Sequence, residues 1–226
     1  MSSIKLVVFD IAGTIIEDHG EVIGAFSRAL QKNEIPFSDV ELKRWKGASK
    51  REVIQHFVRQ YGCSDSEQND KIETTYQCFR AELENLYRER MNPIEGAAAT
   101  FTWCRKCNIQ IATTTGFYRE VSELILSLMG WRDMFAANIS SSDVRQGRPA
   151  PFMIFRAMEA VGVHDVREVI NVGDTPLDLQ SGHNAGVRGI VGVLTGAHDP
   201  ERLRREPHTH IIPSVAELPE LIEREF

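Results

Sequence analysis

Short apolar runs that alternate with helical segments constrain the fold of this chain more than any other feature. The runs are rich in β-branched residues and bounded by turn signals, which is typical of buried strands. The predicted strands are Ile4–Phe9, Ile109–Thr113, Val169–Val172, Gly189–Val193 and His210–Ile212. The predicted helices between them are Ile94–Cys107, Arg119–Met129, Phe152–Val161 and Asp178–Ala185. Strands that alternate with helices form parallel sheets, so we expect an α/β fold with a parallel sheet.

One long interval, residues 17–92, breaks this alternation. Its apolar residues recur at helical spacing, and it contains no convincing strand. The helical patterns cover Val22–Leu30, Val53–Tyr61 and Ile72–Leu86, with turn signals near Ile35–Asp39 and Gly62–Asp65. We therefore predict two domains: a core of residues 1–16 and 93–226, and a helical domain of residues 17–92 inserted after the first strand.

The composition narrows the class of protein. The 226 residues include 26 Lys and Arg against 32 Asp and Glu, a net charge of −6 that argues against general nucleic-acid binding. The longest stretch without charged side chains, Cys107–Tyr118, is far shorter than the roughly 20 apolar residues of a transmembrane helix. Asp10 interrupts any signal-peptide region, and four cysteines fit a reducing compartment. We expect a cytoplasmic protein that does not cross a membrane.

Polar residues stand where the predicted strands end. Ligands of open α/β sheets bind outside the carboxyl ends of the strands, so these residues are candidates for a site. They belong to four motifs: Asp10-Ile-Ala-Gly-Thr14, Thr113-Thr-Thr-Gly116, Gly147-Arg-Pro149 and Gly173-Asp-Thr-Pro-Leu-Asp178. Together they offer carboxylates for Mg²⁺, and a hydroxyl, a flexible backbone N–H and a guanidinium for phosphoryl oxygens. The motifs therefore predict a site for magnesium and phosphate.

The order and spacing of these motifs, with the helical segment after the first, resemble the haloacid dehalogenase-like superfamily of phosphotransferring hydrolases over essentially the whole chain. The resemblance implies a Rossmann-like core with an inserted helical cap domain. It implies that Asp10 is the nucleophile and forms an aspartyl-phosphate, which water hydrolyses. It also implies that Thr115 and the Gly116 N–H hold the transferring phosphoryl group and that Arg148 neutralises its charge.

Ala12 is the position at which this chain departs from most phosphatases of the superfamily. They carry an acid there that protonates the leaving alcohol, and this chain has no such donor. The phosphonatase (phosphonoacetaldehyde hydrolase) branch is similar, because it also has Ala at this position and Arg at the position of Arg148. Its stretch after the second motif resembles Thr115-Gly-Phe-Tyr-Arg-Glu120. Breaking a carbon–phosphorus bond leaves a carbanion, which needs an electron sink rather than an acid.

Lys50 is the expected electron sink. In phosphonatases a cap Lys in a Gly-x-x-Lys stretch forms a protonated imine with the substrate aldehyde, and this chain has Gly47-Ala-Ser-Lys50. The match is partial, because Lys46 replaces the Met before that Gly and Val53 replaces the His after the Lys. The same loop resembles β-phosphoglucomutase relatives, in which a cation at this position binds a distal phosphate. Lys50 stands within a basic segment, Lys43–Arg51, that can attract an anionic substrate.

These features predict a Mg²⁺-dependent hydrolase that acts through an aspartyl-phosphate on a small phosphonate or phosphorylated metabolite. The expected catalytic residues are Asp10, Lys50, Thr115 and Arg148. The expected substrate-binding residues are Thr14, Lys50, Gly116 and Arg148. The expected Mg²⁺ ligands are Asp10, the backbone carbonyl of Ala12, Asp174 and Asp178.

Two alternatives stay open at this point. One is a phosphatase that acts on a small phosphate ester and uses Lys50 as a cation. The other is a catalytically inactive phosphate-binding or interaction module. The expected partner is the small substrate alone, without nucleic acid or membrane, and the chain is expected to be a monomer or a homodimer.

Overall fold

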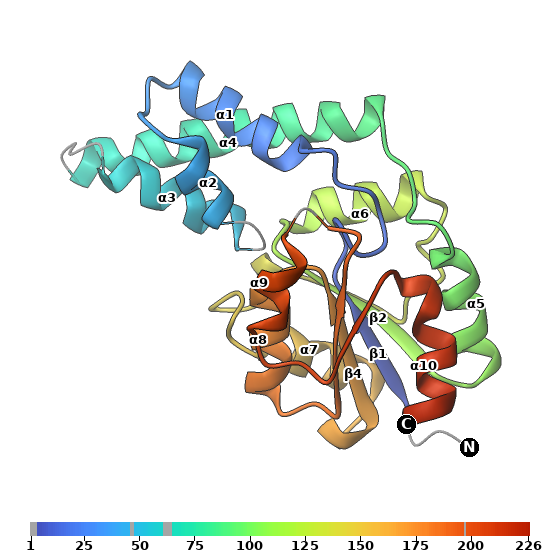
Figure 1. The fold of residues 1–226 in the computed structure, drawn as a ribbon. Coiled ribbons are helices and arrows are strands. Elements are labelled where there is room, and N and C mark those ends of the chain that lie inside the picture. Colours follow the sequence, from blue (N-terminus) through green and yellow to red (C-terminus); the bar gives the residue numbers. More distant parts are fainter. Residues whose placement is uncertain (1–3, 46–47, 61–64, 197) are drawn as a thin grey trace.

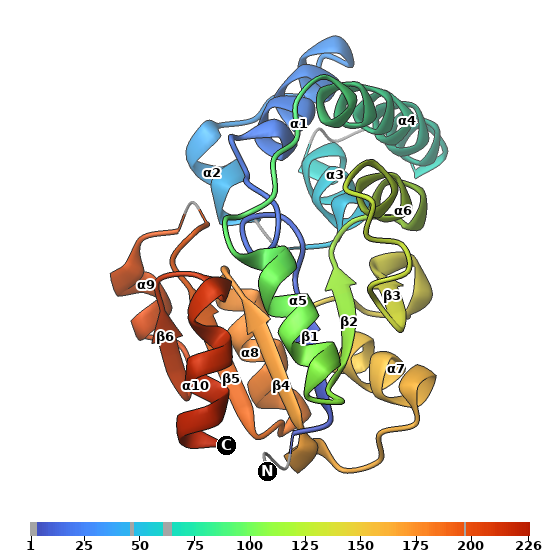
Figure 2. The same ribbon diagram turned by 90° about the vertical axis from the view of Figure 1, so that its right-hand side faces the viewer.

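The fold is built around a six-stranded sheet in which all neighbouring strands run parallel (Figures 1 and 2). The computed structural model describes residues 4–45, 48–60, 65–196 and 198–226. The strands are β1 (Leu6–Phe9), β2 (Gln110–Thr115), β3 (Ala137–Ser140), β4 (Val169–Gly173), β5 (Gly189–Val193) and β6 (His210–Ile212). Their order across the sheet is β3-β2-β1-β4-β5-β6. The predicted α/β fold with a parallel, Rossmann-like sheet is confirmed.

Helices cover both faces of this sheet. They are α5 (Ala97–Lys106), α6 (Arg119–Leu128), α7 (Phe152–Val161), α8 (Pro176–Ala185), α9 (Pro200–Arg204) and α10 (Leu218–Glu225). Side chains alternate between the faces along a strand. Phe9 of β1 accordingly packs edge-on against Phe101 of α5, with ring centroids 5.4 Å apart. Val8 belongs instead to the apolar cluster that contains Ile154 of α7 and Leu179 of α8. Burial on both faces explains why β1 is a continuous apolar run.

A layer of helices lies above the carboxyl ends of the strands (Figure 1). It consists of α1 (Glu21–Lys32), α2 (Asp39–Arg44), α3 (Lys50–Gln60) and α4 (Asp65–Glu89). Phe26 of α1 stacks on Phe79 of α4 at 4.2 Å, which joins the two longest helices of the layer. Although α4 is long, no helix of the described residues combines the length and apolar character of a membrane span. Tyr61 and residues 62–64 of the predicted turn Gly62–Asp65 lie outside the described residues, and Asp65 begins α4.

The chain passes into this helical layer and returns from it at one place. Ile16 and Pro93 form an antiparallel bridge, and the N–H of Glu17 donates to the carbonyl of Asn92 at 2.9 Å. The two connections therefore lie side by side. A segment inserted in this way leaves β1 and β2 free to pair, because its ends are already close together.

Three short elements, α2, α9 and β3, were not predicted, because none of them shows a clear apolar pattern. Helix α9 has five residues, of which only Leu203 is buried. Helix α2 has six residues, of which only Leu42 is buried, so it is too short to show a helical period. It begins after Ser38, whose side chain accepts the N–H of Glu41, where the sequence suggests only a turn. Strand β3 is half-buried along Ala137–Ile139 and therefore has no continuous apolar run.

Candidate active site

The sequence motifs meet at the carboxyl edge of the sheet, where β1, β2 and β4 end side by side. Phe9 of β1 is in register with Thr113 of β2 and with Val172 of β4. Asp10 follows β1 directly, and Asp174 follows β4. Parallel pairing thus brings together motifs that are far apart in the sequence.

The carboxylates of Asp10, Asp174 and Asp178 form a group that fits a metal ion. One oxygen of each lies within 4.8 Å of the others, and all three side chains are buried. Buried carboxylates this close repel one another, and a cation between them relieves the repulsion. Hard oxygen donors of this kind suit Mg²⁺. The structure thus brings together the three predicted side-chain ligands, and Ala12 lines the cavity beside Asp10.

Asp174 is packed against backbone on two sides. A Cβ atom at Gly13 would lie 2.5 Å from Asp174 Oδ2, and one at Gly196 would lie 1.8 Å from it, so neither position admits a side chain. Gly13 also has a φ of +89°, which favours glycine. Gly196 is absent from the residues predicted for the site. Its position soon after the predicted strand Gly189–Val193, at the same sheet edge, is the signal that could have found it.

Thr14 lies beside this acidic group. Its hydroxyl donates to Asp174 Oδ1 at 3.2 Å, and the side chain is fully buried. Thr14 does not belong to the lining of the cavity described below. The structure therefore places Thr14, a predicted substrate-binding residue, against the predicted metal ligand Asp174.

Arg148 lies between two carboxylates at the base of the site. We call Arg148, Asp10 and Asp178 the floor of the site. Its Nη1 lies 2.7 Å from Asp10 Oδ1 and 2.9 Å from Asp178 Oδ1. Its Nη2 donates to the carbonyl and the hydroxyl of Thr114, at 2.7 and 2.9 Å. The guanidinium is buried and held on several sides, so its position beside Asp10 is fixed before any substrate binds.

Asp178 also has a structural role at the start of α8. Its Oδ2 accepts hydrogen bonds from the backbone N–H and the hydroxyl of Thr175, at 3.0 and 2.6 Å. The Thr175 hydroxyl oxygen in turn accepts the N–H of Asp178, which completes a capping box. One carboxylate oxygen of Asp178 therefore caps the helix, and the other faces Arg148.

Burial and a neighbouring cation act on the pKa of Asp10 in opposite directions. Burial raises the pKa of Asp10 to about 6, and the nearby charge of Asp178 acts in the same direction. The ion pair with Arg148 opposes this rise. A further cation near Asp10 would lower the pKa and favour the ionised nucleophile.

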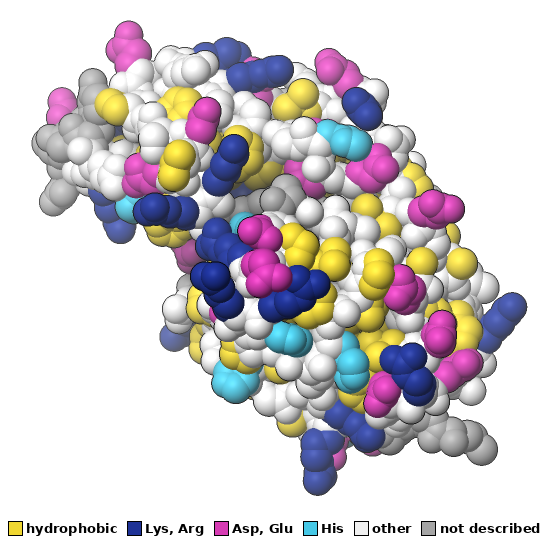
Figure 3. Space-filling model, viewed as in Figure 1, with side chains coloured by type: hydrophobic (Ala, Val, Ile, Leu, Met, Phe, Trp, Pro, Cys, Tyr) yellow, Lys and Arg dark blue, Asp and Glu magenta, His cyan; other side chains and the backbone are white. Residues whose placement is uncertain are grey.

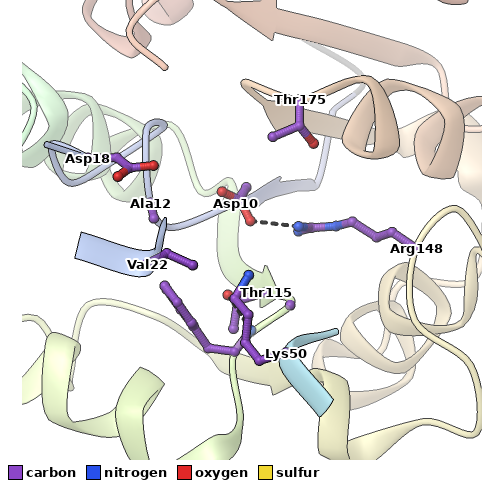
Figure 4. A pocket seen from close by; sticks show the side chains of 10 residues that line it. Asp10, Ala12, Asp18, Val22, Lys50, Thr115, Arg148 and Thr175 are labelled. Atoms are coloured by element: carbon purple, nitrogen blue, oxygen red, sulfur yellow. Dashed lines mark hydrogen bonds and ion pairs between the residues drawn. The ribbon is translucent and has the colours of Figure 1, made fainter. Parts of the chain in front are cut away.

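The predicted residues surround a small cavity of about 30 Å³ (Figure 4). Its lining includes the predicted residues Asp10, Ala12, Lys50, Thr115, Gly116 and Arg148. It also includes Asp18, Val22, Phe117 and Thr175, for which no role in the site was predicted. Thr175 and Phe117 stand inside the quoted motifs, whereas Asp18 and Val22 carry no motif signal. The cavity lies between the sheet edge and the helical layer, because both contribute side chains to it.

Lys50 is the first residue of α3 and is the charged side chain that this helix contributes to the cavity lining. Its backbone N–H donates to the carbonyl of Gly116 at 3.3 Å. Its Nζ donates to the carbonyl of Ala48 at 3.2 Å and lies 4.9 Å from the ring centroid of Phe117. Val53, at the position of the His of phosphonatases, is fully buried among apolar residues. Lys46 and Gly47 lie outside the described residues.

A wider cavity of about 640 Å³ shares Asp18 with the site. It is lined by residues of both layers, including Lys43 of α2 and Arg202 of α9. In the space-filling view, Lys and Arg side chains lie on both sides of the hollow between the layers, interspersed with acidic ones (Figure 3). Lys43 of the predicted basic segment and Arg202 of α9 therefore line the same cavity.

Known proteins resemble this chain over most of its length. The profile of haloacid dehalogenase-like hydrolases matches residues 7–192. The phosphonoacetaldehyde hydrolase of Hahella chejuensis is 31% identical, over 97% of this chain and 86% of its own. That of Bacillus cereus is 28% identical, over 87% of this chain and 78% of its own.

Solved structures show the same fold. A phosphonoacetaldehyde hydrolase-like protein from Oleispira antarctica superposes with a TM-score of 0.84 at 22% identity, over 98% of this chain and 92% of that one. A hydrolase from Pseudomonas syringae superposes with the same TM-score at 20% identity, over 97% of this chain and 99% of that one.

Proposed function

Because this chain belongs to the haloacid dehalogenase-like hydrolase family, in its phosphonatase-like branch, we propose that it hydrolyses the carbon–phosphorus bond of phosphonoacetaldehyde or a similar small phosphonate. One observation carries this proposal. The amine of Lys50 and the carboxylate of Asp10 line a single cavity, in which Ala12 offers no acid to a leaving alcohol. The cavity is small, which favours a small substrate.

In this proposal the two layers are a core domain, residues 1–16 and 93–226, and a cap domain, residues 17–92. The cap would shield the bound substrate from water, which strengthens the electrostatic interactions inside. The paired connections at Glu17 and Asn92 support this division, because a segment attached at one place can move as a unit.

Asp10 would attack phosphorus and form the aspartyl-phosphate. Its ion pair with Arg148 favours the ionised carboxylate, and the same guanidinium is placed to neutralise charge on the phosphoryl oxygens. The Thr115 oxygen accepts the N–H of Phe117 at 3.1 Å, which leaves its O–H proton for a phosphoryl oxygen. Mg²⁺ bound by Asp10, Asp174, Asp178 and the Ala12 carbonyl would supply further positive charge.

Lys50 would provide the electron sink. Its amine condenses with the substrate aldehyde and releases water, which gives a protonated imine. As the bond from Asp10 oxygen to phosphorus forms, the electrons of the carbon–phosphorus bond pass into the imine and give an enamine. Protonation of the enamine carbon and hydrolysis return the Lys50 amine and release an aldehyde. Water then hydrolyses the aspartyl-phosphate and releases phosphate.

A second candidate function is hydrolysis of a small phosphate ester, with Lys50 acting as a cation. The surroundings of Lys50 favour this reading, because a carbonyl oxygen and an aromatic face both stabilise an ammonium group. The same floor residues would transfer the phosphoryl group. Water, rather than a side chain at position 12, would then supply the proton of the leaving alcohol.

Phosphate release distinguishes the two functions. The purified protein is incubated with phosphonoacetaldehyde and, in parallel, with a panel of small phosphate esters, each with Mg²⁺ and with EDTA. The proposal expects Mg²⁺-dependent phosphate release from phosphonoacetaldehyde that exceeds release from every ester. Phosphate release from an ester but not from phosphonoacetaldehyde would contradict the proposal and favour the second function.

A further inference from the structure

One face of α4 holds the loop that follows β2. Tyr76, Arg80, Glu84 and Tyr87 follow one another at intervals of four, four and three residues, so they share one side of the helix. We call these four residues the α4 stripe. Each of them contacts a residue between Phe117 and Glu120, the segment that follows Thr115 and Gly116.

Tyr118 is the centre of these contacts. Its hydroxyl donates to Glu84 Oε1 at 2.8 Å, and its ring meets that of Tyr76 edge-on at 5.9 Å. The Arg80 guanidinium lies 4.3 Å from the Tyr118 ring centroid and forms an ion pair with Glu120 at 3.1 Å. Burial and the neighbouring carboxylate of Glu84 hold the pKa of Tyr118 well above its usual range, so the hydroxyl stays a donor.

Phe117 links the α4 stripe to the cavity. Its ring meets Tyr87 edge-on at 5.9 Å and also lies beneath the Lys50 amine, 4.9 Å from Nζ. The next residue back, Gly116, accepts the backbone N–H of Lys50. The loop held by α4 is thus the surface on which Lys50 rests.

We propose that the α4 stripe positions Lys50, because the contacts of the stripe with Tyr118 and Phe117 fix the Phe117 ring beneath the Lys50 amine. Tyr118 and Glu84 are then positioning residues, which act on the reaction through Lys50 without touching the substrate. The effect on turnover rests on the function proposed above. The effect on the Lys50 amine itself is independent of the substrate.

The same helix offers a matched control. Glu82 lies two residues from Glu84 but pairs with Arg28 and Lys32 of α1, at 3.2 and 2.6 Å, entirely within the helical layer. Glu82→Gln and Glu84→Gln are therefore equal chemical changes on one helix. Only the second weakens a contact with the loop beneath Lys50, because an amide oxygen accepts the Tyr118 hydroxyl less strongly than a carboxylate does.

Amine labelling tests the positioning directly. Reductive methylation of Lys50 is followed by peptide mass spectrometry, relative to Lys5, whose side chain is 62% exposed. Tyr118→Phe and Glu84→Gln should each speed Lys50 labelling by about tenfold, since local opening exposes protected groups. Glu82→Gln should leave it unchanged. Equal labelling in all variants, or an equal increase in Glu82→Gln, would overturn the proposal whatever the substrate is.

Steady-state kinetics provide the second measurement, on the substrate that the wild-type enzyme turns over. A misplaced reactive group costs kcat rather than KM, so Tyr118→Phe should lower kcat about tenfold and change KM less than about twofold. A graded pair reports the same contact: Glu84→Ala removes the acceptor of the Tyr118 hydroxyl altogether, so it should lose more kcat than Glu84→Gln, whose amide oxygen can still accept. An unchanged kcat together with a lowered melting temperature would show that the stripe only stabilises the fold, and would also overturn the proposal.

Discussion

The core side and the helical side of the cavity hold their charged groups in different ways. On the core side, Arg148 lies within 2.9 Å of both Asp10 and Asp178, and all three are buried. On the helical side, Lys50 reaches the cavity from the first turn of α3 and rests on the Phe117 ring. These three residues all belong to the core, from the end of β1, the segment before α7 and the start of α8, whereas Lys50 depends on where the helical layer lies. This difference suggests that phosphoryl chemistry belongs to the core and substrate choice to the helical layer.

Removing the nucleophile should have the largest effect. Asp10→Asn keeps the shape of the side chain but cannot attack phosphorus, so kcat should fall by at least about 10⁴-fold on every substrate. Phosphate release under saturating substrate measures this loss. Asp18→Asn is the matched control, because Asp18 is a carboxylate on the helical side of the same cavity. A comparable loss in both variants would contradict the separate roles of the two sides.

Changes at Lys50 should depend on the substrate. For phosphonoacetaldehyde, Lys50→Ala and Lys50→Arg should both lose about 10³-fold in kcat/KM, because neither side chain forms an imine. For a phosphate ester, Lys50→Arg should retain most of the activity, since it keeps the positive charge. Near-normal cleavage of the phosphonate by Lys50→Arg would refute the imine.

The core side was predictable because its chemistry follows from topology. Strands β1, β2 and β4 can each be recognised in the sequence as a short apolar run, and their ends carry Asp10, Thr115 and Asp174. Parallel pairing must bring such strand ends together. The hydrogen bonds from Arg148 to Thr114 were not predictable, since they depend on the path of the irregular segment before Pro149.

Binding of Mg²⁺ should stabilise the core side measurably. A ligand at about 100 times its Kd adds roughly 2.7 kcal/mol to the free energy of unfolding. For a chain of this size that raises the melting temperature by roughly 5–10 °C. Thermal unfolding with EDTA and with Mg²⁺ checks this expectation. Asp174→Asn should lose the shift, whereas Lys50→Ala should keep it, and a shift that survives in Asp174→Asn would place the ion elsewhere.

The pH dependence of stability should be the smallest effect. In the metal-free protein the pKa of Asp10 is raised from 3.8 to about 6, so the folded state binds the Asp10 proton more tightly than the unfolded state. The contribution of Asp10 to stability therefore falls as pH rises from about 4 to above 6, and about 1–2 kcal/mol of this fall lies between pH 5 and pH 7.5. Denaturant unfolding in EDTA at pH 5 and pH 7.5 measures it. The difference in unfolding free energy between Asp10→Asn and wild type should grow with pH, and a constant difference would contradict the raised pKa.

The helical side was only partly predictable. The periodicity of its apolar residues predicts its helices. Lys50 was predicted as a site residue from the resemblance of Gly47-Ala-Ser-Lys50 to the Gly-x-x-Lys stretch of phosphonatases. The contacts of Tyr118 with Glu84 join residues 34 positions apart on elements that belong to different layers. Sequence periodicity shows which face of a helix is apolar, but not which loop of the other layer it meets.

The most direct test of the account is to trap the bond between Lys50 and the substrate. The wild-type enzyme is treated with borohydride in the presence of phosphonoacetaldehyde, and the modified peptide is identified by mass spectrometry. The account predicts inactivation, with a stable adduct on Lys50 that is absent in Lys50→Arg and does not form without the aldehyde. Full activity after treatment, with an unmodified Lys50 peptide and continued cleavage of phosphonoacetaldehyde, would contradict it.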